Sequence, residues 1–214
     1  MDILIFIFEI IGIATYAVLG AMTAIKKRMD LFGTVILGIV TAMGGGIIRD
    51  IILGRTPPVA FVKPVYASVA IICSLIIAVP GIRLVLVKSK KIYNKAMFIL
   101  DTVGLSFFTV IGIGIAFESA QYNMFLVVFV GVITGVGGGV IRDILSGEIP
   151  HIFVKHIYAS ASILGAIAAA FLWDMAGKFI AMVLGMAVII VVRVLSAHFK
   201  WNLPIILNDE EKRH

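Results

Sequence analysis

Residues 41–51 read Thr-Ala-Met-Gly-Gly-Gly-Ile-Ile-Arg-Asp-Ile, and residues 134–144 read Thr-Gly-Val-Gly-Gly-Gly-Val-Ile-Arg-Asp-Ile. The match resumes further along, where Phe-Val-Lys-Pro-Val-Tyr-Ala-Ser at 61–68 corresponds to Phe-Val-Lys-His-Ile-Tyr-Ala-Ser at 153–160. Self-similarity over this many positions indicates an internal repeat with a period of about 92 residues. The match also extends upstream, where Glu9, Gly12 and Gly20 correspond to Asp101, Gly104 and Gly112.

The composition excludes a soluble globular protein. Of 214 residues, 61% are hydrophobic and 14% are charged, whereas soluble domains average about 45–50% and about 25%. The mean hydropathy is +1.14. The net charge of +6 does not indicate nucleic-acid binding, because basic residues in a membrane protein mark its cytoplasmic loops. The single cysteine, Cys73, excludes an intrachain disulfide and argues against a metal cluster, so no cofactor is predicted.

Seven apolar stretches are near or above the length needed to cross about 30 Å of hydrocarbon as helices. Membrane barrels would show short alternating segments instead. We therefore predict an all-α membrane protein with seven transmembrane helices in one transmembrane domain, residues 1–200. The expected parts are repeat one at 1–82, repeat two at 96–173, an extra helix at 178–197 and a short cytoplasmic tail at 198–214. The predicted spans are 3–25, 31–53, 65–82, 96–117, 124–145, 157–173 and 178–197.

The distribution of basic residues predicts the orientation. Seven spans place the two termini on opposite sides of the membrane. Of the 18 Lys and Arg residues, all but Arg49, Arg55, Lys63 and Lys178 fall on the side that holds the 83–95 loop and the C-terminus. Because cytoplasmic loops are enriched in Lys and Arg, we expect the C-terminus to be cytoplasmic and the N-terminus to be outside.

The repeat also predicts an inverted architecture. Each copy holds three spans, and an odd number makes the second copy enter the membrane from the opposite face. Inverted repeats of this kind place a substrate or ion path near the midplane, where corresponding helices are interrupted.

The glycine triplets Gly44, Gly45, Gly46 and Gly137, Gly138, Gly139 lie inside the second and fifth spans. Glycine is a poor helix former, so each triplet can break its helix and turn carbonyl oxygens towards a water-filled path. The alternative is close packing, because small residues let membrane helices approach each other. Both interpretations stay open at this point.

Charged residues accompany each triplet. Arg49 and Asp50 follow the first triplet, and Arg142 and Asp143 follow the second. Charges inside a span are costly and usually face a partner or water, although these can also reach the membrane surface. By depth we expect Glu9 to pair with Arg49, and Asp101 to pair with Arg142. The alternative, a bond between each arginine and its neighbouring aspartate, is disfavoured because adjacent helical positions point in different directions.

Hydroxyl side chains can contribute to a polar path. Thr15 and Ser106 lie in the first and fourth spans, together with Tyr16 and Thr109. Hydroxyls in membrane helices often bond to a carbonyl of their own preceding turn instead.

Two copies of Gly-Gly-Gly-x-x-Arg-Asp in seven spans, arranged as three-plus-three inverted repeats, resemble the prokaryotic relatives of the trimeric intracellular cation (TRIC) channels. The resemblance covers essentially residues 1–200. It implies a homotrimer in the inner (plasma) membrane, with one pore inside each protomer that conducts monovalent cations, chiefly potassium. Potassium or sodium ions and membrane lipids are the partners implied, with no nucleic acid.

The resemblance also implies which residues form the pore. In that family the second and fifth helices, kinked at the glycines, bound the pore together with the first and fourth helices. This marks the triplets at 44–46 and 137–139 as kinks, with Arg49, Asp50, Arg142 and Asp143 beside them.

A potassium channel is therefore the leading hypothesis. A secondary transporter of a small amino acid is the alternative, because inverted repeats with broken helices are also found in transporters and bacterial sequences of this family have been labelled glycine transporters. The third hypothesis is a non-conducting membrane scaffold. We predict that the protein is no enzyme, because the sequence holds no nucleophile–base pair, phosphate loop or metal cluster.

Overall fold

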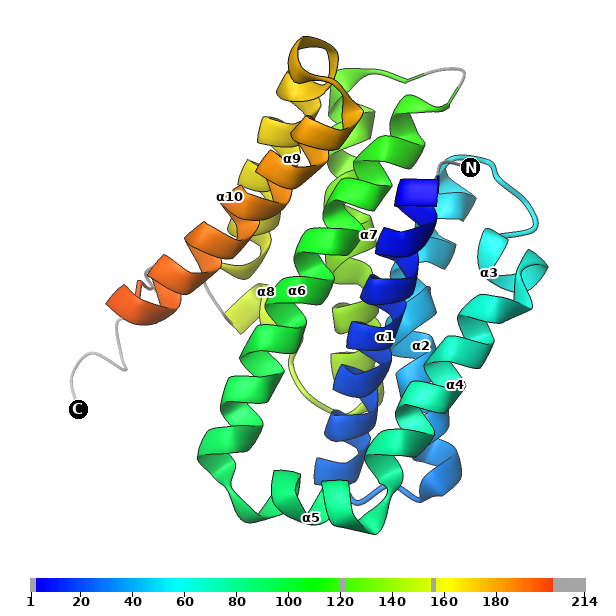
Figure 1. Ribbon diagram of the computed structural model, residues 1–214, viewed down its shortest axis with the longest axis vertical. Coiled ribbons are helices and arrows are strands. Elements are labelled where there is room, and N and C mark those ends of the chain that lie inside the picture. Colours follow the sequence, from blue (N-terminus) through cyan, green and yellow to red (C-terminus); the bar gives the residue numbers. More distant parts are fainter. Residues whose placement is uncertain (1–2, 120–121, 155–156, 202–214) are drawn as a thin grey trace, which may run out of the picture.

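The computed structural model describes residues 3–119, 122–154 and 157–201, which are almost entirely helical (Figure 1). Six of the helices are long and apolar enough to cross a membrane. A shorter apolar helix, α4, and three further helices complete the described chain. The long helices are α1 (Ile3–Lys26), α2 (Leu31–Ile52), α6 (Lys90–Phe117), α7 (Met124–Leu145), α9 (Tyr158–Ala176) and α10 (Lys178–Phe199), and the others are α3 (Val59–Val62), α4 (Pro64–Ala78), α5 (Pro80–Lys88) and α8 (His151–Val154).

Six of the predicted spans agree with long helices, but the third, 65–82, begins where α4 begins and extends past its end. The helix α4 ends at Ala78, and Val79 is extended with ψ 131°. Pro80 disfavours the helical conformation of the residue before it, so the chain turns there and α5 begins. The predicted loop at 83–95 is consequently mostly helical. Ser89 separates α5 from α6 and caps α6 by accepting a hydrogen bond from the Ile92 amide at 3.3 Å.

The four helices α1, α2, α6 and α7 form the centre of the molecule. Here α1 packs against α2 and α6, α6 packs against α7, and α7 packs against α2. In Figure 1, α4 lies beside this centre at one side, while α9 and α10 lean together at the other. The core contains fully buried apolar side chains from both repeats, among them Ile5, Leu19, Ile111 and Ile113. The two repeats therefore share one core.

The repeats begin and end their central helices in the same way. Asp30 accepts a hydrogen bond from the Gly33 amide at 2.7 Å and caps α2, and Asn123, 93 positions later, caps α7 through the Leu126 amide at 2.8 Å. Short polar side chains are favoured at this position because they satisfy an amide that has no helical partner. The corresponding positions of the two sequence repeats therefore have the same capping role in the structure.

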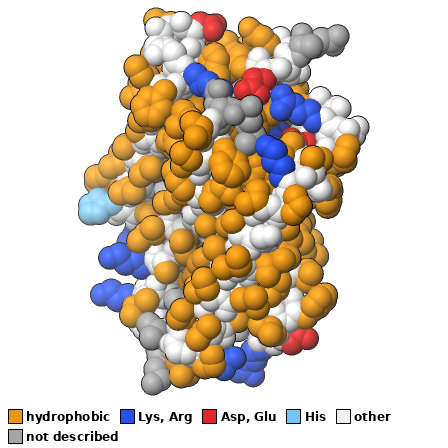
Figure 2. Space-filling model, turned by 45° about the vertical axis from the view of Figure 1, so that its right-hand side comes forward, with side chains coloured by type: hydrophobic (Ala, Val, Ile, Leu, Met, Phe, Trp, Pro, Cys, Tyr) orange, Lys and Arg blue, Asp and Glu red, His pale blue; other side chains and the backbone are white. Residues whose placement is uncertain are grey.

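The outer surface is apolar. Hydrophobic side chains cover most of the face shown in Figure 2, and large ones such as Phe32, Phe125 and Met175 are 74%, 80% and 83% exposed. A surface of this kind fits hydrocarbon better than water. The predicted tail at 198–214 begins inside α10, which continues to Phe199, and its residues 202–214 lie outside the described residues, as do Lys155 and His156.

Candidate functional site

The glycine triplets bring α2 and α7 into backbone contact. A Cβ added to Gly45 would lie less than 3.0 Å from the Thr134 carbonyl oxygen, and one added to Gly138 would lie as close to the Thr41 carbonyl oxygen. Only glycine permits such an approach. Residue 41 contacts 138 while residue 45 contacts 134, so the two helices cross in opposite directions.

Neither triplet breaks its helix. The helix α2 is continuous over Gly44–Gly46, and α7 is continuous over Gly137–Gly139. The expectation of interrupted helices with freed carbonyl oxygens is therefore wrong, and the triplets do not act by unwinding. Inside a membrane an unpaired backbone group costs several kcal/mol, which outweighs the weak helix propensity of glycine, about 1 kcal/mol per residue.

The other triplet residues have different surroundings. A Cβ on Gly137 would lie 3.1 Å from Gly45 Cα, so Gly137 belongs to the crossing. A Cβ on Gly44 would meet only the end of the Ile141 side chain at 2.7 Å. A Cβ added to Gly46 would lie 3.7 Å from Arg49 Nη2, and one added to Gly139 would lie 3.2 Å from the Tyr158 hydroxyl and 3.8 Å from Arg142 Nη2, so neither meets the backbone of the other helix.

A buried cluster of charges lies beside the first triplet. Arg49 Nε donates a hydrogen bond to Asp50 Oδ1 at 2.8 Å, and Arg49 Nη1 lies 3.8 Å from Glu9 Oε1. The Tyr66 hydroxyl donates a hydrogen bond to Glu9 Oε2, and the Val59 amide donates one to Asp50 Oδ2 at 2.9 Å. We call Glu9, Arg49, Asp50 and Tyr66 the first cluster. It contains two acids and one arginine.

The second repeat builds an equivalent cluster. Arg142 Nη2 lies 2.7 Å from Asp143 Oδ1, and Arg142 Nη1 lies 3.7 Å from Asp101 Oδ1. The Tyr158 hydroxyl donates to Asp101 Oδ1 at 3.2 Å, and the His151 amide donates to Asp143 Oδ2 at 2.9 Å. Asp101, Arg142, Asp143 and Tyr158 form the second cluster.

The predicted pairs Glu9–Arg49 and Asp101–Arg142 are thus present, but they are not the closest contacts of the arginines. Each arginine makes its shortest contact with the aspartate that follows it in the sequence. The prediction disfavoured this local pairing. The Cα–Cβ bonds of neighbouring residues do point apart, but the long arginine side chain can bend back and reach the short side chain of the next aspartate. The tyrosines Tyr66 and Tyr158 were missed, although both occupy the same place in the repeated segment Phe-Val-Lys-x-x-Tyr-Ala-Ser.

Two of the predicted hydroxyl residues, Thr15 and Ser106, form hydrogen bonds within their own helices. Thr15 donates to the Ile11 carbonyl at 2.6 Å, and Ser106 donates to the Val103 carbonyl at 2.8 Å. Both hydroxyls therefore bond to a carbonyl of the preceding turn, the alternative to lining a polar path. Tyr16 and Thr109 differ. The Tyr16 hydroxyl on α1 donates to the Gly135 carbonyl on α7 at 2.8 Å, and Thr109 Oγ1 on α6 shares a hydrogen bond of 2.8 Å with Ser162 Oγ on α9.

The two clusters adjoin cavities of unequal size. The first cluster lines a cavity of about 30 Å³. The second lines an open cavity of about 690 Å³, whose wall also includes Lys26, Glu148, Arg193 and Lys200. In the described part of the chain, Arg142 Nη1 is the one buried side-chain nitrogen or oxygen that lacks a hydrogen-bond partner.

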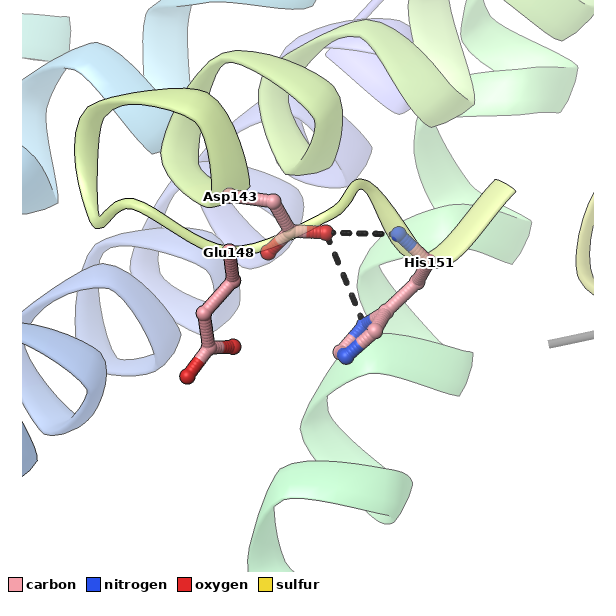
Figure 3. Close-up of side chains that lie close together, drawn as sticks. All are labelled: Asp143, Glu148 and His151. Carbon is pink, nitrogen blue, oxygen red and sulfur yellow. Dashed lines mark hydrogen bonds and ion pairs between the residues drawn. The ribbon is translucent and has the colours of Figure 1, made fainter. Parts of the chain in front are cut away.

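Three side chains in this cavity have the composition of a metal site. Ligand atoms of Asp143, Glu148 and His151 lie within 4.8 Å of one another (Figure 3). However, Arg142 Nη2 lies 2.7 Å from Asp143 Oδ1 and 3.4 Å from His151 Nδ1, and Lys27 Nζ lies 3.0 Å from Glu148 Oε1, so basic side chains of the protein already contact all three residues. This cluster is an ion-pair network of the protein's own side chains.

Glu148 also connects the repeats. Its carboxylate lies 3.0 Å from Lys27 Nζ, which belongs to the loop between α1 and α2. Burial alone would raise the pKa of Glu148, but the hydrogen bond and charge of Lys27, with the charge of Lys26, outweigh burial and lower it.

Comparisons with known proteins agree with this architecture. The sequence profile of the family described as "Glycine transporter" matches residues 6–80 and 98–174, one stretch in each repeat. The chain is 39% identical to the UPF0126 inner membrane protein YadS of Escherichia coli K12, over 98% of this chain and 100% of that protein.

Solved structures give the same result. The fold matches the TRIC trimeric intracellular cation channel orthologue from Rhodobacter sphaeroides with a TM-score of 0.85 and 31% identity, over 94% of this chain and 100% of that one. A chain of a further TRIC cation channel matches with a TM-score of 0.82 and 36% identity, over 95% and 97% of the two chains. The relatives are membrane proteins and channels, which agrees with the prediction that the protein is no enzyme. The chain is thus an integral membrane protein of the UPF0126 family, the family described as "Glycine transporter", and its fold is similar to that of solved prokaryotic TRIC cation channels.

Proposed function

We propose that this chain is a monovalent cation channel, chiefly for potassium, with a pore inside each protomer of a homotrimer. The observation that carries the proposal is the pair of buried charge clusters on corresponding residues of the two repeats. Ionisable side chains inside a membrane protein are costly and usually mark an ion path. The similarity to solved TRIC cation channels supports the same function.

The proposed architecture has seven membrane spans, in one domain of residues 1–200, as two inverted repeats and an extra helix. The opposite directions of α2 and α7 at their crossing support the inversion. The helix α4, with 15 residues, is about 22 Å long, so α3 or α5 completes its span. The Lys and Arg distribution supports an N-terminus outside and a C-terminus in the cytoplasm of a prokaryotic cell.

The proposed ion path connects the two clusters past the crossing of α2 and α7. Glu9 and Asp50 attract cations at one end, and Asp101 and Asp143 line the path at the other end. Each arginine offsets one acid of its cluster. Gly46 and Gly139 lie near the arginines, and because they have no side chains they leave space for the path there.

A secondary transporter of glycine is the second candidate, because the profile of the family carries that description. A transporter must open alternately to the two sides, and such folds usually rock one repeat against the other. In this chain the two repeats share one core and touch through their backbones, which favours a channel.

Recording from purified protein in planar bilayers tests the proposal. In symmetrical KCl we expect discrete ohmic steps, and in a KCl gradient a reversal potential near that of potassium. Saturable uptake of labelled glycine into proteoliposomes, without current steps, would establish the transporter instead.

Neutralising one acid then tests the path. Glu9→Gln removes the charge that attracts cations to the first cluster, so we expect the conductance to fall about threefold or more. Glu118→Gln is the matched control, because the Glu118 side chain is 45% exposed and its ion pairs are with Arg55 and Lys178, which belong to neither cluster. Equal conductance in the two variants would contradict a path at Glu9.

A further inference from the structure

The two charge clusters differ in one residue that lies outside the repeat. Arg193, on α10, donates from Nη2 to Asp101 Oδ2 at 2.8 Å and from Nε to Thr102 Oγ1 at 3.1 Å. Its guanidinium also lies over the rings of Phe98 and Tyr158, at 5.2 and 4.6 Å from their centres. The side chain is buried and its contacts fix it in one place.

The first repeat lacks the means to hold such a residue. The position that corresponds to Thr102 is Ile10, which has no acceptor for a guanidinium, whereas Phe6 corresponds to Phe98. In the described residues, Glu9 contacts Arg49 and Tyr66, both from its own repeat. The second repeat has thus gained an anchor that accepts an arginine from the extra helix.

The additional arginine changes the charge balance of the path. The first cluster has two acids and one arginine, and the charge of Lys63 also acts on Glu9. Asp101 and Asp143 face two arginines, Arg142 and Arg193, so the second cluster is neutral. Lys26 and Lys200 also line the large cavity, against the single further acid Glu148. A cation that enters this cavity meets no net attraction.

We propose that Arg193 is a conduction-limiting residue that occupies Asp101 and thereby keeps permeant cations from binding in the second half of the path. This rests on the channel function proposed above. In a site of low dielectric, the occupancy of a cation-binding position depends strongly on charges within a few ångströms. Removing one such charge therefore changes the occupancy strongly. Arg193 also lines the large cavity, but it acts on conduction through Asp101 and is therefore a positioning residue.

The test compares Arg193→Met with the wild type in planar bilayers. Methionine keeps the length and the apolar stem but removes the charge. We expect the single-channel conductance to rise about twofold or more, mainly for cations that enter from the cavity side, so that the current rectifies. Arg193→Lys, which retains the charge, should conduct like the wild type.

A second background separates the electrostatic role from a structural one. If Arg193 acts by occupying Asp101, Arg193→Met should change nothing in an Asp101→Asn protein. A structural anchor for α10 would instead reduce trimer recovery and leave no rectification. If Arg193→Met does not fold, Arg193→Gln decides, because its neutral amide keeps a polar side chain beside Asp101 without the charge and should raise the conductance in the same direction.

The outcomes distinguish this inference from the channel proposal. If the wild type gives no current, the channel function fails. If the wild type conducts and folded Arg193→Met or Arg193→Gln shows unchanged or lower conductance, the channel stands and the role of Arg193 is overturned.

Discussion

Gly45→Ala is expected to lower the free energy of unfolding by about 3 kcal/mol, the upper range for overpacking a tight contact. The added Cβ would lie less than 3.0 Å from the Thr134 carbonyl oxygen. Backbone cannot move away as a flexible side chain can, so α2 and α7 must separate along their crossing. Thermal unfolding of the purified protein in detergent, followed by circular dichroism, measures the loss.

Gly46→Ala is the matched control, because it makes the same chemical change one residue further along the same helix. The nearest atom to its added Cβ is Arg49 Nη2 at 3.7 Å, an ordinary contact. Alanine is a better helix former than glycine by about 0.8–1.0 kcal/mol, so this variant should be as stable as the wild type or slightly more stable. Equal losses at the two positions would show that flexibility, not the crossing, is what the triplet provides.

Arg49→Gln is the second change with a large expected effect. Removing one partner of a buried ion pair typically costs about 3–5 kcal/mol, because the remaining charge stays buried. Here two carboxylates, Asp50 and Glu9, would lose their guanidinium. Arg55→Gln is the control, since Arg55 is partly exposed and lies 3.9 Å from Glu118, and exposed pairs contribute about 0–1 kcal/mol.

Double-mutant cycles then rank the two partners. Arg49 lies 2.8 Å from Asp50 and 3.8 Å from Glu9, and coupling energies of residues in one network range over about 0.5–3 kcal/mol. We expect coupling near the upper end with Asp50→Asn and near the lower end with Glu9→Gln. A larger coupling with Glu9 would mean that the pairing across helices, and not the local one, holds the arginine.

Much of this fold was predictable because membrane helices leave a simple signal. Length and hydropathy located six long helices, since every backbone group in hydrocarbon must be paired within its own segment. The exception, at Pro80, depended on the geometry of the residue before proline and not on hydropathy. Self-comparison also located Glu9, Arg49 and their counterparts, because the repeat preserves their spacing.

Other features left a weaker signal or none. The glycine triplets permitted two opposite interpretations, and only the distance between α2 and α7 decides between them. Arg193 was counted among the basic residues of one side, although a lone arginine inside an apolar helix is itself a signal for a buried partner. Its partner could not be identified, because α10 has no copy against which to compare it.

The crossing of α2 and α7 limits how the sequence can change over generations. A clash between two side chains can be relieved by a second substitution that shortens the partner. Here the obstructing atoms are the main-chain oxygens of Thr41 and Thr134, which every amino acid carries in the same place. A substitution at Gly45 or Gly138 therefore cannot be suppressed by a change at the residue it contacts, and a selection for revertants should return the original glycine and no second-site suppressor at Thr41 or Thr134.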